Sequence, residues 1–158
     1  MQRNRQPEQA LQKQAVQLYE HVIHPMYPDS LLIANPLSSI SLGPQGGRLM
    51  AQMKRSGLRK GQPDILIICK REIESRESEG TSFKGLKRVR VYSGLAIELK
   101  AEGAALWKKD GQLATSEHLS NQAAWLEKAR ANGWMAEFAQ GLDEVIALYN
   151  LYFGVKII

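Results

Sequence analysis

Little in this sequence points to a secreted or membrane-spanning protein. The 158 residues include one cysteine, Cys69, so an internal disulfide is excluded, and we expect a reducing compartment, the cytoplasm. No apolar run approaches the length of a membrane span, and residues 1–7 lack the apolar core of a signal peptide. The chain also shows no internal repeat and no linker between domains.

What is present is the composition of an ordinary globular domain. Hydrophobic residues make up 44% of the chain and charged residues 23%, which is typical of folded proteins. The length predicts one domain, residues 1–158, with room for a sizeable core. The net charge of +5 at pH 7 favours a polyanionic partner.

Two short apolar runs are typical of buried strands, and each has charged residues at one end. The first run follows Gly61-Gln62-Pro63-Asp64, and the second ends in Glu98-Leu99-Lys100. If these strands pair antiparallel, Asp64 lies beside Glu98 and Lys100. Because side chains alternate along a strand, Glu98 and Lys100 share one face of the sheet.

Two carboxylates and an ammonium group at one end of a rigid sheet predict a hydrolytic metal site. Carboxylate oxygens are the ligands that a hard cation such as Mg²⁺ prefers. A lysine close to that cation can orient or activate the attacking water. We therefore expect Asp64 and Glu98 to bind a metal ion and Lys100 to take part in catalysis.

Basic residues gather in two blocks, 48–60 and 84–90, that contain no acidic residue. Such runs are usually solvated surface. Each block, however, flanks a strand of the predicted site, and this position favours contacts with phosphate groups. The residues that we expect to contact phosphate groups are Arg48, Lys54, Arg55, Arg59, Lys60, Lys84, Lys87 and Arg88.

The order of three motifs resembles a known nuclease family. Pro63-Asp64 followed by Glu98-Leu99-Lys100 resembles the PD-(D/E)xK nuclease signature. With residues 55–62, with Leu119-Ser120-Asn121-Gln122-Ala123-Ala124-Trp125-Leu126 and with Gly133, the chain is similar to a VRR-Nuc domain (virus-type replication and repair nuclease) over residues 15–152. An acidic residue followed two positions later by lysine is expected by chance about once in a chain of this length. The Pro-Asp pair is not unique either, because Pro28-Asp29 also precedes an apolar run. The order of the motifs therefore carries the resemblance.

The resemblance implies a restriction-endonuclease-like α/β fold, with a small mixed sheet flanked by helices, and a metal-dependent deoxyribonuclease that uses Mg²⁺ or Mn²⁺. It adds three residues to the site. The backbone carbonyl of Leu99 becomes a further metal ligand, and Glu20 on the first helix faces the metal. Gln122 completes the catalytic group. The ordinary alternatives are a surface position for Glu20 and a solvated amide for Gln122.

The substrate implied by the resemblance is branched DNA, such as a four-way (Holliday) junction. The resemblance also implies a role in DNA repair and a bacterial or phage origin. The alternatives are a flap- or end-directed nuclease and a DNA-binding module without catalysis. We also expect a homodimer, because one small chain with one site cannot reach two phosphates on opposite arms. Tyr149 and Phe153, four residues apart, are predicted to form its outer apolar patch. His21 and His24 are predicted to be surface or capping residues, or at most phosphate contacts.

Hydrophobic periodicity and helix caps predict the remaining elements. Ser120 is expected to cap the helix that carries Gln122 in its first turn, and Asp143 to cap the last helix. Residues 70–92 form either a short structure of their own or a mobile arm, although the apolar residues after position 88 favour an early start of the second strand, near Lys87. The expected elements are a helix over 7–23, a strand over 31–34, a helix over 47–56, strands over 64–69 and up to 100, a loop over 101–115, a helix from 120, a strand over 134–139 and a final helix.

Overall fold

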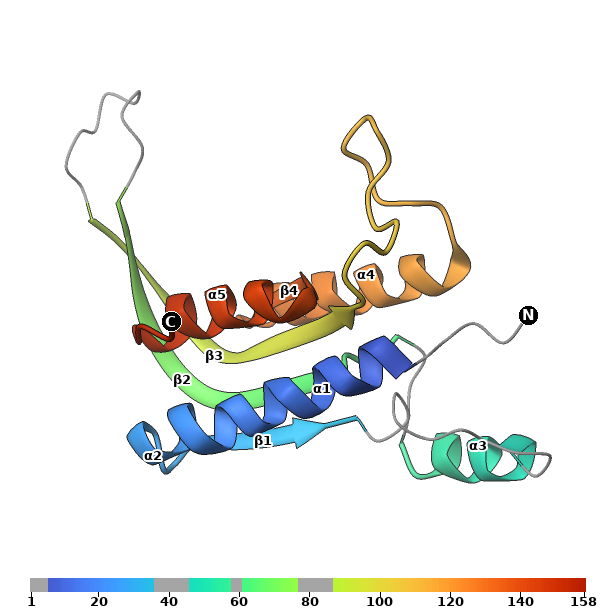
Figure 1. Ribbon diagram of the computed structural model, residues 1–158, viewed down its shortest axis with the longest axis horizontal. Helices are drawn as coiled ribbons and strands as arrows, with labels where there is room; N and C mark the ends of the chain where they lie inside the picture. Colours follow the sequence, from blue (N-terminus) through green and yellow to red (C-terminus); the bar gives the residue numbers. More distant parts are fainter. Residues whose placement is uncertain (1–5, 36–45, 58–60, 77–86) are drawn as a thin grey trace.

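A computed structural model of the protein describes residues 6–35, 46–57, 61–76 and 87–158 (Figure 1). Helices and strands alternate along most of the chain, so the predicted α/β class is confirmed. The elements are α1 (Gln6–Leu18), the π-helix η1 (Tyr19–Ile23), α2 (His24–Met26), β1 (Leu31–Ala34), α3 (Gly46–Arg55), β2 (Ile65–Arg76), β3 (Lys87–Lys100), α4 (Glu117–Ala131), β4 (Met135–Gln140) and α5 (Gly141–Phe153).

One mixed sheet of four strands, in the order β1-β2-β3-β4, forms the centre of the fold. The pairs β1/β2 and β2/β3 are antiparallel, whereas β3 and β4 are parallel and are joined through α4. A parallel pair needs such a crossover because the chain must return to the same end of the sheet. Ile65 pairs with Ile97, which confirms the expected antiparallel pairing of the two site strands.

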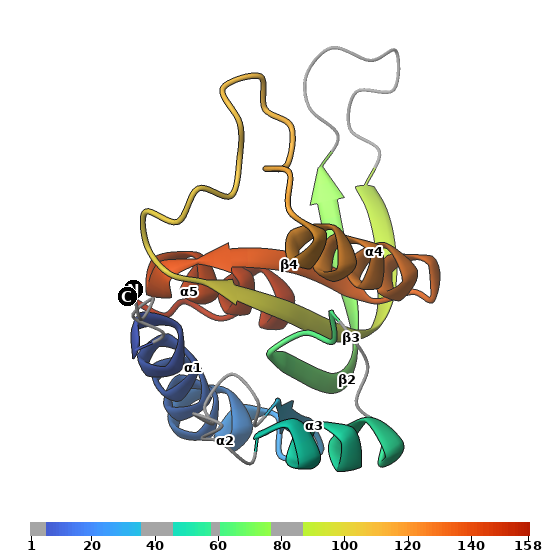
Figure 2. The ribbon, with the colours of Figure 1, turned by 90° about the vertical axis from the view of Figure 1, so that its right-hand side faces the viewer.

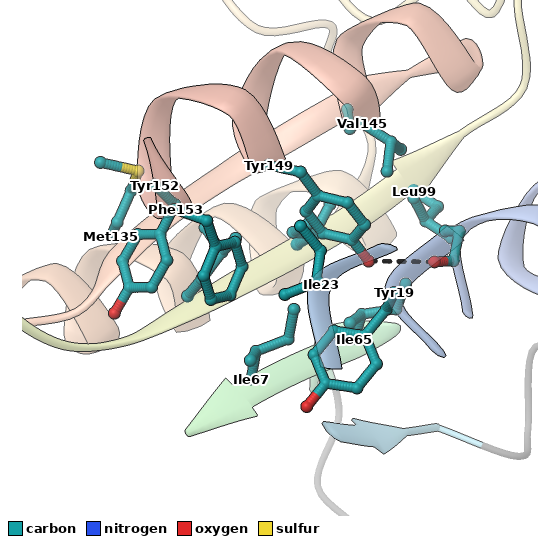
Figure 3. Close-up of a cluster of buried hydrophobic side chains, with 14 of the residues drawn as sticks. Tyr19, Ile23, Ile65, Ile67, Leu99, Met135, Val145, Tyr149, Tyr152 and Phe153 are labelled. Atoms are coloured by element: carbon teal, nitrogen blue, oxygen red, sulfur yellow. Dashed lines mark hydrogen bonds between the residues drawn. The ribbon is translucent and has the colours of Figure 1, made fainter. Parts of the chain in front are cut away.

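Helices cover both faces of the sheet. Alternate residues of β3 point to opposite faces, so Leu95, Ile97 and Leu99 join the core under α1 and α5. Ala96 belongs instead to a smaller cluster with Leu126 of α4. The larger core is rich in aromatic side chains, and Figure 3 shows those of α5 pointing toward the strands.

The β2–β3 hairpin is longer than the apolar runs predict. β2 continues to Arg76, and a register shift between Ile68 and Arg71 marks a bulge where the hairpin bends away from the sheet (Figure 1). The early start of β3 at Lys87 is confirmed. The tip of the hairpin, residues 77–86, lies outside the described residues. In β2, strand pairing therefore continues through a charged stretch, residues 70–76, that lacks a sustained apolar alternation.

Two predicted helix caps are wrong. The helix α4 begins one turn early, because Ser116 is extended and its Oγ accepts a hydrogen bond from the Leu119 amide at 3.1 Å. Ser120 therefore lies inside the helix. The helix α5 begins at Gly141, and Glu144 rather than Asp143 accepts a hydrogen bond from the Gln140 amide, at 2.6 Å.

The predicted outer patch on the last helix is also wrong. Tyr149, Tyr152 and Phe153 are fully buried, and the Tyr149 hydroxyl donates to the Ala15 carbonyl oxygen at 3.2 Å (Figure 3). The cause is the position of α5, which packs against both the sheet and α1 and so needs a wide apolar face. Leu151, by contrast, is 55% exposed.

Membrane insertion is not indicated by the helices in the described ranges, since none of them is both long enough and apolar enough to cross a bilayer.

Candidate active site

The carboxylate of Asp64 is held against β3 by the pairing of the two site strands. Asp64 lies immediately before β2, and its Oδ2 accepts a hydrogen bond from the Leu99 amide at 2.8 Å. Its backbone carbonyl accepts bonds from the Asn35 amide at 2.7 Å and from Gln12 Nε2 at 3.1 Å. Strand β3, the end of β1 and helix α1 therefore all position this one residue.

Glu98, Lys100 and Gln122 form a buried polar cluster on the opposite face of β3 from the aromatic core. Their exposed fractions are 2%, 7% and 5%. Lys100 Nζ donates to Glu98 Oε1 at 3.1 Å, and Gln122 Nε2 donates to the same oxygen. The structure thus brings these three predicted residues together, with Gln122 in the second turn of α4 rather than the first.

The electrostatics of this cluster favour a positive charge beside Glu98. Burial, and next the negative charge of Asp64, raise the pKa of Glu98 to about 9, while Lys100 acts in the opposite direction. Within the described residues, Glu98 Oε2 and Gln122 Oε1 are buried oxygen atoms that lack a hydrogen-bond partner. Both atoms would be satisfied by a cation or by donor groups brought by a ligand.

These residues fit a divalent metal ion. Among the described residues no group of three or more His, Cys, Asp or Glu side chains gathers at one point. A Mg²⁺ site does not need three, since this ion is commonly bound by one or two carboxylates together with water and substrate phosphate. Asp64 and the unpartnered oxygen of Glu98 supply ligands of the type that such an ion prefers.

No protein-family model matches this sequence, and no curated protein matches it by sequence. A solved structure described as a VRR_NUC domain protein is similar over 94% of this chain and 88% of its own, with a TM-score of 0.57 and 19% sequence identity. The protein has the fold of a VRR-Nuc domain. The likeness confirms the restriction-endonuclease-like architecture.

The structure does not bring the predicted Glu20 to the polar cluster, and the glutamate of the first helix whose charge reaches Glu98 is Glu8. The charge of Glu8 contributes to the raised pKa of Glu98. Glu20 is exposed and lies in η1, about 18 Å farther along the helix axis at about 1.5 Å per residue. One turn after Glu8 comes Gln12, whose contact with Asp64 fixes this end of α1 at the site. The hydrophobic periodicity of the first helix did not reveal this, because it shows which face of the helix is buried and not which end of the helix lies nearest the site.

The Gly-x-Pro-Asp motif also has a structural role in this protein. Gly61 has a φ of +77°, and a Cβ atom there would lie only 2.4 Å from the Asn121 carbonyl oxygen. The loop before Asp64 therefore packs directly on α4, one residue before Gln122. A side chain at position 61 would push the two halves of the site apart.

The basic residues predicted to bind DNA are only partly described. Arg48 and Arg55 are exposed on α3, in the connection that leads from β1 to Asp64. The helix begins and ends close to its predicted bounds. Arg59, Lys60 and Lys84 lie outside the described residues, as do the side chains of Lys54, Lys87 and Arg88.

The histidines of the first helix do not join the polar cluster. His21 is exposed, and its Nδ1 lies 2.7 Å from the Gln17 carbonyl oxygen. His24 is partly buried, with its ring 5.9 Å from that of Tyr19. Both belong to the C-terminal end of the helix, away from the Glu8 end that lies at the site.

Proposed function

We propose that residues 1–158 form one nuclease domain that hydrolyses DNA phosphodiester bonds with the help of a divalent cation. The observation that carries the proposal is the convergence of Asp64, Glu98, Lys100 and Gln122 at one end of β3, with unpartnered oxygen atoms buried among them. The VRR-Nuc fold supports the same activity.

Asp64 and Glu98 would hold the cation, Mg²⁺ or Mn²⁺, together with the Leu99 carbonyl, and Glu8 would add negative charge nearby. A cation bound there would offset negative charge on the phosphate under attack. Lys100 would orient the attacking water and stabilise the charge that develops on the phosphate oxygens. Gln122 would keep Glu98 in position through its amide, as it does now.

Cleavage assays with Mg²⁺ or Mn²⁺ test this proposal. Wild-type protein should cut labelled DNA, whereas Lys100→Ala should not. Lys70→Ala is the matched control, because Lys70 is an exposed lysine of the neighbouring strand β2. A DNA-binding module without catalysis would bind the substrates and cut none of them with either ion.

The proposed substrate is branched DNA such as a four-way junction, and a flap- or end-directed nuclease is the alternative. Exposed arginines on α3, next to the segment that positions Asp64, support binding to a DNA backbone close to the site. A panel of linear, flapped and four-way DNA with both ions distinguishes these substrates. Rapid cutting of linear ends alone would argue against the junction.

We also propose that the protein acts as a homodimer, through a different surface from the one predicted on α5. An open groove of about 640 Å³ lies between β4, an edge strand, and α5, and it is lined in part by Ala147, Leu148 and Leu151. Arg90 and Glu144 also line it, so a copy related by a two-fold axis could pair opposite charges. Sedimentation of Leu151→Asp against wild type tests this surface. A wild-type monomer, both free and on junction DNA, would exclude the dimer.

A further inference from the structure

The connection between β3 and α4, residues 101–116, projects from the sheet as a loop with an exposed tryptophan. Both ends of this loop are attached to the candidate active site, since Lys100 precedes it and the helix of Gln122 follows it. Figures 1 and 2 show the loop rising from the end of β3 and returning to α4. Trp107 is 57% exposed, and Lys108 and Lys109 beside it are also exposed.

The outer part of this loop is a small hairpin with a defined turn. Trp107 and Leu113 form an antiparallel bridge, and the Lys108 amide donates to the Gln112 carbonyl at 2.7 Å. The turn is closed by the Gly111 amide, which donates to the Lys108 carbonyl at 3.0 Å. Gly111 has a φ of +78°, which glycine adopts at no steric cost. These contacts therefore define the backbone that carries Trp107.

The base of the loop is attached to the sheet. Leu106, immediately before the tryptophan, is buried, and its carbonyl accepts a hydrogen bond from the Ala114 amide at 2.8 Å. Gln140 at the end of β4 donates to the carbonyls of Ala104 at 2.6 Å and Ala101 at 3.4 Å. These contacts hold the hairpin in a fixed place relative to Lys100.

An exposed tryptophan on such a hairpin needs an explanation beyond packing. Single exposed apolar residues are common on protein surfaces. Here, however, the neighbouring Leu106 provides the anchor to the sheet, and the tryptophan contributes its large ring to a tip with two lysines. An aromatic ring flanked by cationic side chains is the usual means of binding an unpaired base and its phosphates.

We propose that Trp107 stacks on an exposed base next to the phosphate that is cut, while Lys108 and Lys109 contact the neighbouring phosphates. In a continuous duplex both faces of each base are covered by its neighbours, so a ring can stack only where a branch, a flap or a single strand leaves a face open. The hairpin would thereby select DNA with an interrupted base stack. This inference rests on the proposed nuclease function and names its specificity-determining residue.

Equilibrium binding without cleavage tests this role. Wild type, Trp107→Ala and Trp107→Phe are titrated, in the presence of a chelator, with linear duplex, single strand and four-way DNA that carry 2-aminopurine at the branch. Trp107→Ala should weaken binding to branched and single-stranded DNA about tenfold, with little effect on linear duplex. Trp107→Phe should recover most of this loss. The change in 2-aminopurine emission on binding should disappear in Trp107→Ala.

Leu31→Ala is the matched control, because Leu31 is another exposed large apolar residue and lies on β1, away from the loop and from the proposed dimer groove. Its binding preference among the three DNAs should equal that of wild type, and all variants should keep the wild-type unfolding midpoint. Equal losses for duplex and branched DNA in Trp107→Ala, or no loss at all, would overturn the stacking role and leave the nuclease proposal standing. Wild-type protein that neither binds nor cuts any of these DNAs would overturn both.

Discussion

The two faces of β3 are buried to almost the same degree and have opposite chemistry. Ile97 and Leu99 pack under α1 and α5 in a core of aliphatic and aromatic side chains. Glu98 and Lys100, the residues that alternate with them, are enclosed on the α4 side together with Gln122. One strand thus serves two environments, each set by the helix that covers it.

The difference shows that the apolar face of β3 stabilises the fold, whereas the polar face lowers its stability. Burial of a large aliphatic or aromatic side chain stabilises a fold by about 1.5–3 kcal/mol, and the aromatic face contains many such residues. Enclosing Glu98 lowers the stability of the fold instead, because burial disfavours the ionised carboxylate and raises its pKa to about 9. Changes on the first face should therefore affect folding, and changes on the second should affect chemistry.

The largest effect is expected for cleavage when the polar face is altered. Asp64→Ala, Glu98→Ala and Lys100→Ala should each lower the cleavage rate about 10³-fold or more, because each removes a group that acts on the attacked phosphate or its cation. The two carboxylate variants should keep an unfolding midpoint close to that of wild type or above it. Folded Asp64→Ala protein that takes up metal and still cuts at the wild-type rate would contradict the site.

The opposite face should respond in stability. Phe153→Ala removes a fully buried ring from the aromatic core and should lower the free energy of unfolding by about 3–5 kcal/mol. Urea unfolding measures this loss. Leu31→Ala, which truncates an exposed leucine of β1, should change stability little. A similar loss in both variants would show that α5 is not packed as described.

The stability of the metal-free protein should fall as the pH rises. The folded-state pKa of Glu98 is about 9, against an ordinary value of 4.5, so over this range the folded protein keeps a proton that the unfolded chain releases. Glu98→Gln cannot lose that proton, and its stability should depend less on pH. Urea unfolding across the range, with a chelator present, compares the two proteins. Identical slopes would show that Glu98 does not hold its proton in the fold.

The smallest effect is expected on α3, whose arginines would act only through the DNA backbone. Arg48→Ala with Arg55→Ala should weaken binding to all DNA sequences alike. The slope of log affinity against log salt concentration should flatten by about 0.9 for each phosphate of duplex DNA that the variant no longer neutralises. Filter binding at several salt concentrations gives this slope. An unchanged slope would identify these residues as ordinary solvated surface.

Local patterns predicted most of the fold and the centre of the site. Strand alternation and antiparallel pairing placed Asp64 beside Glu98 and Lys100, and the structure confirms that arrangement. The match to the nuclease family failed for Glu20, and helical spacing failed for Tyr149 and Phe153. In each of these cases the residue type and its helical spacing were suitable, but the contacts of the helix with the rest of the protein decided otherwise.

The sequence by itself determined the spacing of apolar residues in helices and strands, the order of the motifs and the residue types that can bind a cation. Each of these depends on a short stretch of chain. Only the tertiary structure decided which end of α1 meets the sheet, so that Glu8 and Gln12 reach the site and Glu20 does not. It also decided that α5 packs against both the sheet and α1, and that the loop after β3 forms a hairpin on which Trp107 is exposed. Packing between distant segments sets these choices, since each helix settles where its whole apolar face is covered.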